Sequence, residues 1–221
     1  MTPALRLAVL ATVLVLGVVL AVRAGTRDAT PIRTLLVTGF GPFGGYETNP
    51  SWEAIRHLDG TRVGGYVIRT AELDVVYAAA PGQLDAAIRE TGAYGVLCFG
   101  VAPGPHIRLE VVARNRDRTA QPDVDGEIRS DVAIRGDGAS LLPTRLPVAA
   151  LREALKAGAW PVVTSEDAGG YLCNHVFYRL MDRGDVPGPR GFVHVPGLEG
   201  DWDLGRLKAA VRVVIETVAA E

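Results

Sequence analysis

Short apolar runs alternate along this chain with amphipathic segments of helical length, and this alternation restricts the possible folds more than any other feature. Strands that alternate with helices favour a parallel sheet with helices on its faces. We therefore expect an α/β protein, a three-layer α/β/α sandwich around a mostly parallel twisted sheet. Buried strands are predicted at residues 33–40 and 94–99, further strands at 67–73, 160–164 and 191–195, and a half-exposed strand at 106–113. Helices are predicted at 49–58, 82–91, 147–157, 171–181 and 203–220.

The composition is that of a folded domain with a normal hydrophobic core. Apolar residues make up 48% of the 221 positions and charged residues 22%. The formal net charge of −2 gives no reason to expect nucleic acid as a partner, because such proteins usually carry a basic face. Two cysteines, Cys98 and Cys173, are too few for a dense disulfide scaffold or a four-cysteine metal site.

The first 24 residues have the pattern of a targeting segment. Arg6 precedes an uncharged run over residues 7–22, and small residues precede a possible cleavage site after Ala24. The segment 1–24 is therefore predicted to be a signal peptide or an N-terminal membrane anchor that contacts the membrane. A buried core helix is disfavoured because the run has no polar face. We expect an exported protein, either membrane-anchored or secreted or periplasmic, with a linker at 25–32 and one domain at 33–221.

Cys173 is a candidate nucleophile because it lies near the start of a predicted helix, just after Ala168-Gly169-Gly170. A helix N-terminus presents free N–H groups and the positive end of the helix dipole, which favour the reactive thiolate and can hold an oxyanion. A small buried apolar residue is an equally good interpretation of the spacing. Cys98 lies in the middle of an apolar strand and is predicted to be core filler.

His194 and Glu110 are candidate partners for such a nucleophile. His194 ends an apolar strand, and strand C-termini line the ligand crevice in open α/β sheets, where an imidazole can act as a base. Glu110 lies in an apolar half-strand and could orient an imidazole. A satisfied core histidine and an outward-facing glutamate remain the alternatives. The other histidines, His57, His106 and His175, are weaker candidates.

Two loops carry further functional signals. The glycine-rich loop 39–45 follows a strand and precedes a helix, but it lacks the Walker lysine and the dinucleotide glycine spacing. Its phenylalanines, Phe40 and Phe43, indicate a flat apolar pocket instead. The segment 114–138 has many charges and little periodicity, which predicts a long loop that covers or binds a ligand.

Several segments taken together resemble the pyroglutamyl-peptidase I family, also called pyrrolidone-carboxylate peptidases. The similar stretches read GFGPFGG at 39–45, NPSWEA at 49–54, AGGYLCNH at 168–175 and GFVHVP at 191–196. A looser similarity covers GVAPG at 100–104 and the segment 107–115. The similar segments occur in unchanged order over roughly residues 33–196, which is most of the predicted domain.

The resemblance implies a phosphorylase/hydrolase-like α/β/α fold, with neither a metal nor another cofactor. It implies a cysteine peptidase that removes an N-terminal pyroglutamyl residue from a peptide substrate through a thioester acyl-enzyme. The family often forms homo-oligomers, so self-association is a further expectation. The implied catalytic residues are Cys173, His194 and Glu110, and the implied substrate-binding residues are Phe40, Phe43 and Tyr171.

The chain departs from the family pattern in the loops 101–105 and 116–125. Pro105 and Val111 stand where the family usually has arginine, and AQPDV at 120–124 replaces a typical RIPDN. These loops are expected to cover the substrate, whereas the three implied catalytic residues are intact. The departures leave three alternatives: an exported amidase or peptidase with shifted specificity, a non-catalytic ligand-binding protein on the same fold, and a nucleoside-phosphorylase-like enzyme.

Overall fold

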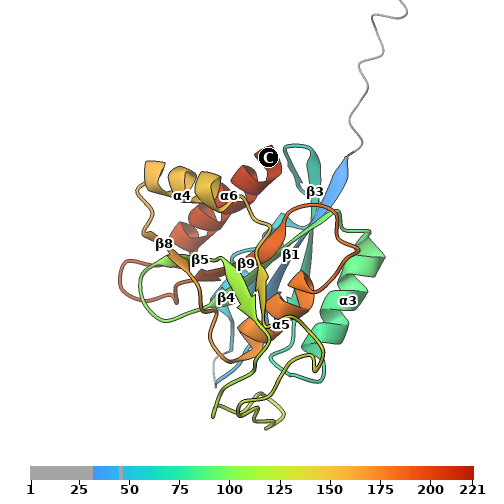
Figure 1. Cartoon of the computed structure of the whole chain (residues 1–221). Helices are drawn as coiled ribbons and strands as arrows, with labels where there is room; N and C mark the ends of the chain where they lie inside the picture. Colours follow the sequence, from blue (N-terminus) through green and yellow to red (C-terminus); the bar gives the residue numbers. More distant parts are fainter. Residues whose placement is uncertain (1–31, 45–46) are drawn as a thin grey trace, which may run out of the picture. The chain divides into compact units, whose positions relative to one another are not determined.

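A computed structural model describes residues 32–44 and 47–221 (Figure 1). The predicted leader, 1–24, and all but the last residue of the predicted linker, 25–32, lie outside the described residues. The elements in chain order are β1 (Arg33–Phe40), α2 (Pro50–Glu53), the 3-10 helix η1 (Arg56–Leu58), β2 (Arg62–Val63), β3 (Tyr66–Leu73), α3 (Ala80–Thr91), β4 (Gly95–Val101), β5 (Ile107–Glu110), β6 (Val112–Arg114), β7 (Leu141–Pro143), α4 (Val148–Ala157), β8 (Val162–Ser165), α5 (Leu172–Met181), β9 (Arg190–Val195) and α6 (Leu204–Ala220).

A seven-stranded sheet in the order β2-β3-β1-β4-β9-β5-β8 forms the centre of the described domain. The four strands β3, β1, β4 and β9 run parallel, as the sequence predicts. Strand β5 is antiparallel to β9 and parallel to β8, so this end of the sheet runs in the opposite direction. The half-exposed strand predicted at 106–113 divides in two, because β6 leaves the sheet and pairs with β7.

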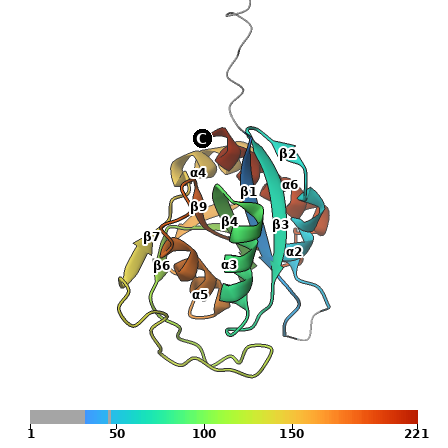
Figure 2. The ribbon, with the colours of Figure 1, turned by 90° about the vertical axis from the view of Figure 1, so that its right-hand side faces the viewer.

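Helices cover both faces of the sheet, which confirms the predicted α/β/α layers (Figures 1 and 2). On one face, α4 and α6 pack on a core that also includes Ile55 and Leu58 from the segment after β1. On the other face, α3 and α5 contribute Leu84, Val176 and Leu180 to a second core. Strand β9 is buried along its whole length because it lies between these two cores.

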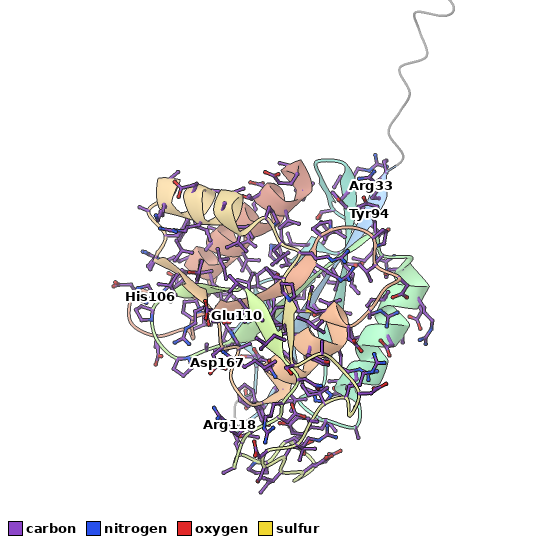
Figure 3. The ribbon with its side chains drawn as sticks, viewed as in Figure 1. Arg33, Tyr94, His106, Glu110, Arg118 and Asp167 are labelled. Atoms are coloured by element: carbon purple, nitrogen blue, oxygen red, sulfur yellow. The ribbon has the colours of Figure 1, made fainter. Side chains whose placement is uncertain are left out.

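The parallel strands give the domain two unlike ends. Arg33 begins β1, and its guanidinium carbon lies 4.1 Å from the centre of the Tyr94 ring. Figure 3 shows this pair at one end of the molecule, Glu110 nearer the middle and Arg118 towards the opposite end. The carboxyl ends of β1, β4 and β9 therefore lie on the Arg118 side, where open α/β sheets bind ligands.

Candidate active site

A cavity of about 1040 Å³ opens at the carboxyl ends of the parallel strands. Side chains and backbone from several segments far apart in the sequence line it. Five residues that the sequence singles out are among the lining residues, namely Phe40, Phe43, Tyr171, Cys173 and His194. Glu110 does not line the cavity but lies directly behind His194. The fold thus brings all six predicted site residues into one region.

Cys173 is the second residue of α5 and is half-buried at the wall of the cavity. Tyr171 is the N-cap of this helix but makes no side-chain cap hydrogen bond. The first-turn amide groups are therefore free to bind an anion, next to the positive end of the helix dipole. The preceding turn requires glycine at Gly169, where φ is 82°, and at Gly170, where an added Cβ would lie 2.1 Å from the Arg118 carbonyl oxygen.

His194 and Glu110 form a buried hydrogen-bonded pair. His194 Nδ1 lies 2.8 Å from Glu110 Oε1, and only 5% of His194 and none of Glu110 is exposed. The antiparallel register opposes Glu110 to Phe192, and Phe192 and His194 are two residues apart on β9. Because residues two apart on a strand share a face, the Glu110 carboxylate can reach the imidazole ring. The reversed direction of β5 is what places the carboxylate there.

The electrostatic setting of His194 favours its protonated form. Burial alone would lower its pKa, but the neighbouring Cys173 and the hydrogen bond to Glu110 raise the pKa to about 9. Cys98 is in the opposite situation, because complete burial raises the pKa of its thiol to about 12. The two cysteines are therefore as different as the sequence predicts: one thiol lines a cavity, and the other is packed in the core.

Gly100 is a residue of this site that the sequence analysis does not identify. An added Cβ at this position would lie 2.8 Å from Cys173 Sγ and 2.8 Å from the Phe192 ring. Gly100 also pairs with His194 in the sheet register. Its lack of a side chain lets the sulfur approach the strand ends closely. A single glycine at the end of an apolar strand gave no signal of this role in the sequence.

The phenylalanine loop is fixed to the start of α2 by two polar side chains. Asn49 donates from Nδ2 to the Gly41 carbonyl, and its Oδ1 accepts from the backbone and hydroxyl groups of Ser51. The Ser51 hydroxyl also accepts from the Phe40 amide. These bonds make Asn49 the N-cap of α2 and hold the loop around Phe40 and Gly41 at the cavity wall.

The long loop 114–138 is attached to the turn of α5 that carries Cys173. Asn174 donates to the carbonyl groups of Arg114 and Arg116, and the Arg118 amide donates to the Gly170 carbonyl. His175 Nδ1 lies 2.7 Å from Asp117 Oδ2 in a second buried pair. His175, a weak candidate by sequence, does not line the cavity. Its partner, Asp117, lies within a charged loop and is not recognisable from sequence.

Both loops that depart from the family pattern contribute to the cavity wall. Val101, Ala102 and Pro103 come from the first loop, and Gln121 comes from the second. Pro105 accepts a hydrogen bond from the Trp202 indole at 2.9 Å, outside the main cavity. Gln121 is therefore the changed residue that a substrate in the cavity would meet, whereas Pro105 and Val111 do not line the cavity.

Comparison with known proteins shows that the chain is a hydrolase of the peptidase class and assigns its family. The family model described as "Pyroglutamyl peptidase" matches residues 33–217, so the chain belongs to the pyroglutamyl peptidase family. The pyrrolidone-carboxylate peptidase of Cupriavidus pinatubonensis is 35% identical over 203 residues, which cover 86% of this chain and 94% of the relative. That of Cupriavidus necator is 39% identical over 174 residues, or 76% of this chain and 80% of the relative.

Solved structures support the same assignment. The crystal structure of pyroglutamyl peptidase I from Bacillus amyloliquefaciens aligns with a TM-score of 0.82 and 31% identity, covering 86% of this chain and 98% of that one. Pyrrolidone carboxyl peptidase from Thermococcus litoralis aligns with a TM-score of 0.79 and 27% identity, covering 85% and 94%. The predicted fold class and the predicted family are both confirmed.

The prediction that the chain is exported or membrane-anchored is contradicted. The matched relatives are bacterial and archaeal pyrrolidone-carboxylate peptidases, and they give no evidence of export. Among residues 32–44 and 47–221, no helix is long and apolar enough to cross a membrane. The prediction rested only on the composition of segment 1–24, and we withdraw export and membrane contact as expectations. Self-association stays a prediction.

Proposed function

We propose that the domain at residues 33–221 removes an N-terminal pyroglutamyl residue from peptides, with Cys173 as the nucleophile. The observation that carries this proposal is a sequence of three neighbouring groups: the Cys173 thiol and the adjacent His194 ring in the cavity wall, and the Glu110 carboxylate behind the ring. Membership of the pyroglutamyl peptidase family supports the same reaction. The relatives named as pyrrolidone-carboxylate peptidases favour it over an amidase, a binding protein or a phosphorylase.

The reaction would begin from an ion pair in which His194 has already taken the proton of Cys173. Nδ1 of His194 is bonded to Glu110, so Nε2 is the nitrogen left for the thiol. The carboxylate fixes the ring orientation and stabilises the imidazolium, which agrees with the raised pKa of His194. The thiolate attacks the pyroglutamyl carbonyl carbon, and the free amides at the start of α5 bind the oxyanion.

The imidazolium then protonates the leaving amine as the C–N bond breaks, and a thioester remains on Cys173. Water attacks this thioester with His194 as the base, releases pyroglutamate and restores the thiol. The uncharged ring would lie against Phe40, Phe43 and Tyr171, because small-molecule pockets are mostly apolar with a few fixed polar groups.

Substitution of the nucleophile tests this proposal directly. We expect the wild type to hydrolyse a pyroglutamyl-arylamide and Cys173→Ala to lose all turnover above background. Cys98→Ala serves as the matched control and should retain activity, because Cys98 is 1% exposed and packed in the core. A mass shift on Cys173 in acid-quenched samples would report the thioester. Equal activity in wild type and Cys173→Ala would overturn the proposed role of the thiol.

A further inference from the structure

The residues that line the cavity include a group of apolar and aromatic side chains from the phenylalanine loop, the segment after β3 and the start of α5. We call this group, Phe40, Phe43, Val75 and Tyr171, the apolar wall. A pyroglutamyl ring seated there would bury the N–H and C=O of its lactam, and each group costs free energy if it loses hydrogen bonding to water without replacement. The wall must therefore supply one acceptor and one donor. Most of the charged lining residues come from other segments, namely Arg108, Glu166, Asp167 and Glu199.

Gln121 is the lining residue whose position matches this need. Its neighbour Pro122 accepts a hydrogen bond from the Tyr171 hydroxyl at 3.0 Å. The amide of Val124, three residues after Gln121, donates to the Val75 carbonyl at 3.0 Å. Because Tyr171 and Val75 both belong to the apolar wall, these two hydrogen bonds tie the segment around Gln121 to that wall.

The segment that carries Gln121 is also fixed relative to the nucleophile. The Arg118 amide donates to the Gly170 carbonyl at 2.9 Å, three residues before Cys173. His175, two residues after Cys173, is paired with Asp117 at 2.7 Å. Contacts on both sides of Cys173 thus hold the start of this segment next to the nucleophile. Such preorganisation favours binding.

The side-chain amide of Gln121 is available for a ligand. It makes no hydrogen bond with any other residue in the described part of the chain, whereas the only other amide side chain among the described lining residues, that of Asn49, is fully engaged by Gly41 and Ser51. A primary amide offers one acceptor and a donor side by side. A lactam presents the complementary pair, a donor N–H beside an acceptor C=O.

We propose that Gln121 is a specificity-determining residue that recognises the lactam edge of the substrate. Its Oε1 accepts from the ring N–H, and its Nε2 donates to the ring C=O. This inference rests on the proposed function, because it assumes that the pyroglutamyl ring occupies the apolar wall. It also assigns a function to the changed sequence at 120–124, because this departure from the family pattern places the Gln121 amide at the cavity wall.

Two substrates separate recognition of the lactam from general effects on catalysis. One is a pyroglutamyl-arylamide, and the other is the cyclopentanecarbonyl-arylamide, which keeps the five-membered ring but lacks the lactam N–H and C=O. We expect Gln121→Leu to lower kcat/KM for the first by about tenfold or more, the equivalent of one or two hydrogen bonds. For the second substrate, assayed with excess enzyme, kcat/KM should change by less than about twofold, because this substrate cannot make those hydrogen bonds.

Asp125→Leu is the matched control, because it places the same side chain at an exposed position of the same loop that does not line the cavity. It should leave both substrates unchanged. The proposal is overturned if Gln121→Leu slows both substrates equally, or if it is indistinguishable from Asp125→Leu with the pyroglutamyl substrate.

A binding measurement tests the recognition without turnover. Pyroglutamyl amide should slow the alkylation of Cys173 by iodoacetamide in the wild type, and Gln121→Leu should need about tenfold more of it for the same protection. One possible outcome is that the wild type hydrolyses no pyroglutamyl substrate, although the protection of Cys173 depends on Gln121. In that case the proposed peptidase activity is wrong and lactam recognition by Gln121 stands. If the wild type hydrolyses the pyroglutamyl substrate but Gln121→Leu does not change the protection, the peptidase activity stands and lactam recognition by Gln121 is wrong.

Discussion

The domain contains two buried histidine–carboxylate pairs with nearly the same geometry and different surroundings. The Nδ1–oxygen distance is 2.8 Å between His194 and Glu110 and 2.7 Å between His175 and Asp117. Both histidines are almost fully buried, and both carboxylates are inaccessible to solvent. Each pair joins segments that are far apart in the sequence. Hydrogen-bond geometry alone therefore does not distinguish a proton-transfer group from a structural one.

The difference lies in what surrounds each pair. His194 lines the cavity beside Cys173, and the only partner of its Glu110 within the described residues is the imidazole itself. Asp117 also pairs with the Arg129 guanidinium at 3.3 Å. The ring of His175 packs edge-on against Tyr77, with 5.5 Å between the ring centres. The first pair has a reactive neighbour and faces the cavity, whereas the second is enclosed by groups that brace the loop.

The largest expected effect separates the two histidines. His194→Gln should lower kcat/KM for a pyroglutamyl-arylamide by about 10³-fold, because it removes the base and the acid of the proposed reaction. His175→Gln keeps a side-chain amide that can donate to Asp117 and should cost less than about tenfold. Steady-state kinetics on samples with unchanged circular dichroism provide the measurement. Comparable losses in the two variants would remove the functional distinction between the pairs.

The next effect concerns the pH dependence of activity. Cys173 and Glu110 raise the pKa of His194 to about 9, so its imidazolium is present below that pH and is lost as the pH rises through it. We expect kcat/KM to fall on the alkaline side near pH 9, where the acid for the leaving amine disappears. Glu110→Gln removes a group that raises this pKa, and should therefore shift the alkaline limb to lower pH and reduce kcat at neutral pH.

Asp117→Asn is the matched control for the pH experiment, since it makes the same change in the other pair. Its alkaline limb should coincide with that of the wild type. A limb that moves equally in both variants, or in neither, would contradict the assignment of this limb to His194. Activity profiles should be compared only over the pH range in which each variant remains folded.

Sequence patterns predicted the main chain of this domain better than its polar contacts. Apolar runs such as that of β9 must be buried whichever partner covers them, so periodicity located most strands and helices. The reversal of β5 was not predictable in this way, because direction depends on a long connection and not on local composition. This reversal places Glu110 behind His194. The periodicity of its strand had instead favoured an outward-facing glutamate.

The site shows the same division between local and long-range information. Cys173 had a local signal in its helix start, and the family resemblance identified the two partners. Gly100 and Asp117 had no such local signal. Gly100 matters because it lacks a side chain, and Asp117 because it pairs with His175, 58 positions away. A compositional pattern without tertiary support was also misleading, as the contradicted export prediction shows.

The smallest expected effect on activity, and a clear one on stability, belongs to the second pair. Asp117→Asn leaves the buried His175 ring without its carboxylate, whereas Arg129 keeps its ion pair with Glu127. Removal of one partner from such a buried pair costs about 1–3 kcal/mol of unfolding free energy. Urea unfolding followed by circular dichroism measures this loss. Because the loop carries Gln121, KM for the pyroglutamyl substrate should rise severalfold while kcat changes little.

Asp125→Asn provides the comparison for this loss of stability, as its carboxylate is exposed on the same loop and makes no side-chain ion pair with the described residues. Asp125→Asn should have the same urea unfolding midpoint as the wild type. If Asp117→Asn also keeps the wild-type midpoint, the His175–Asp117 pair does not brace the loop. If Asp117→Asn instead loses kcat as severely as His194→Gln, the second pair acts in the chemistry itself. An unfolding midpoint that falls while kcat is retained is the result that separates a bracing pair from a catalytic one.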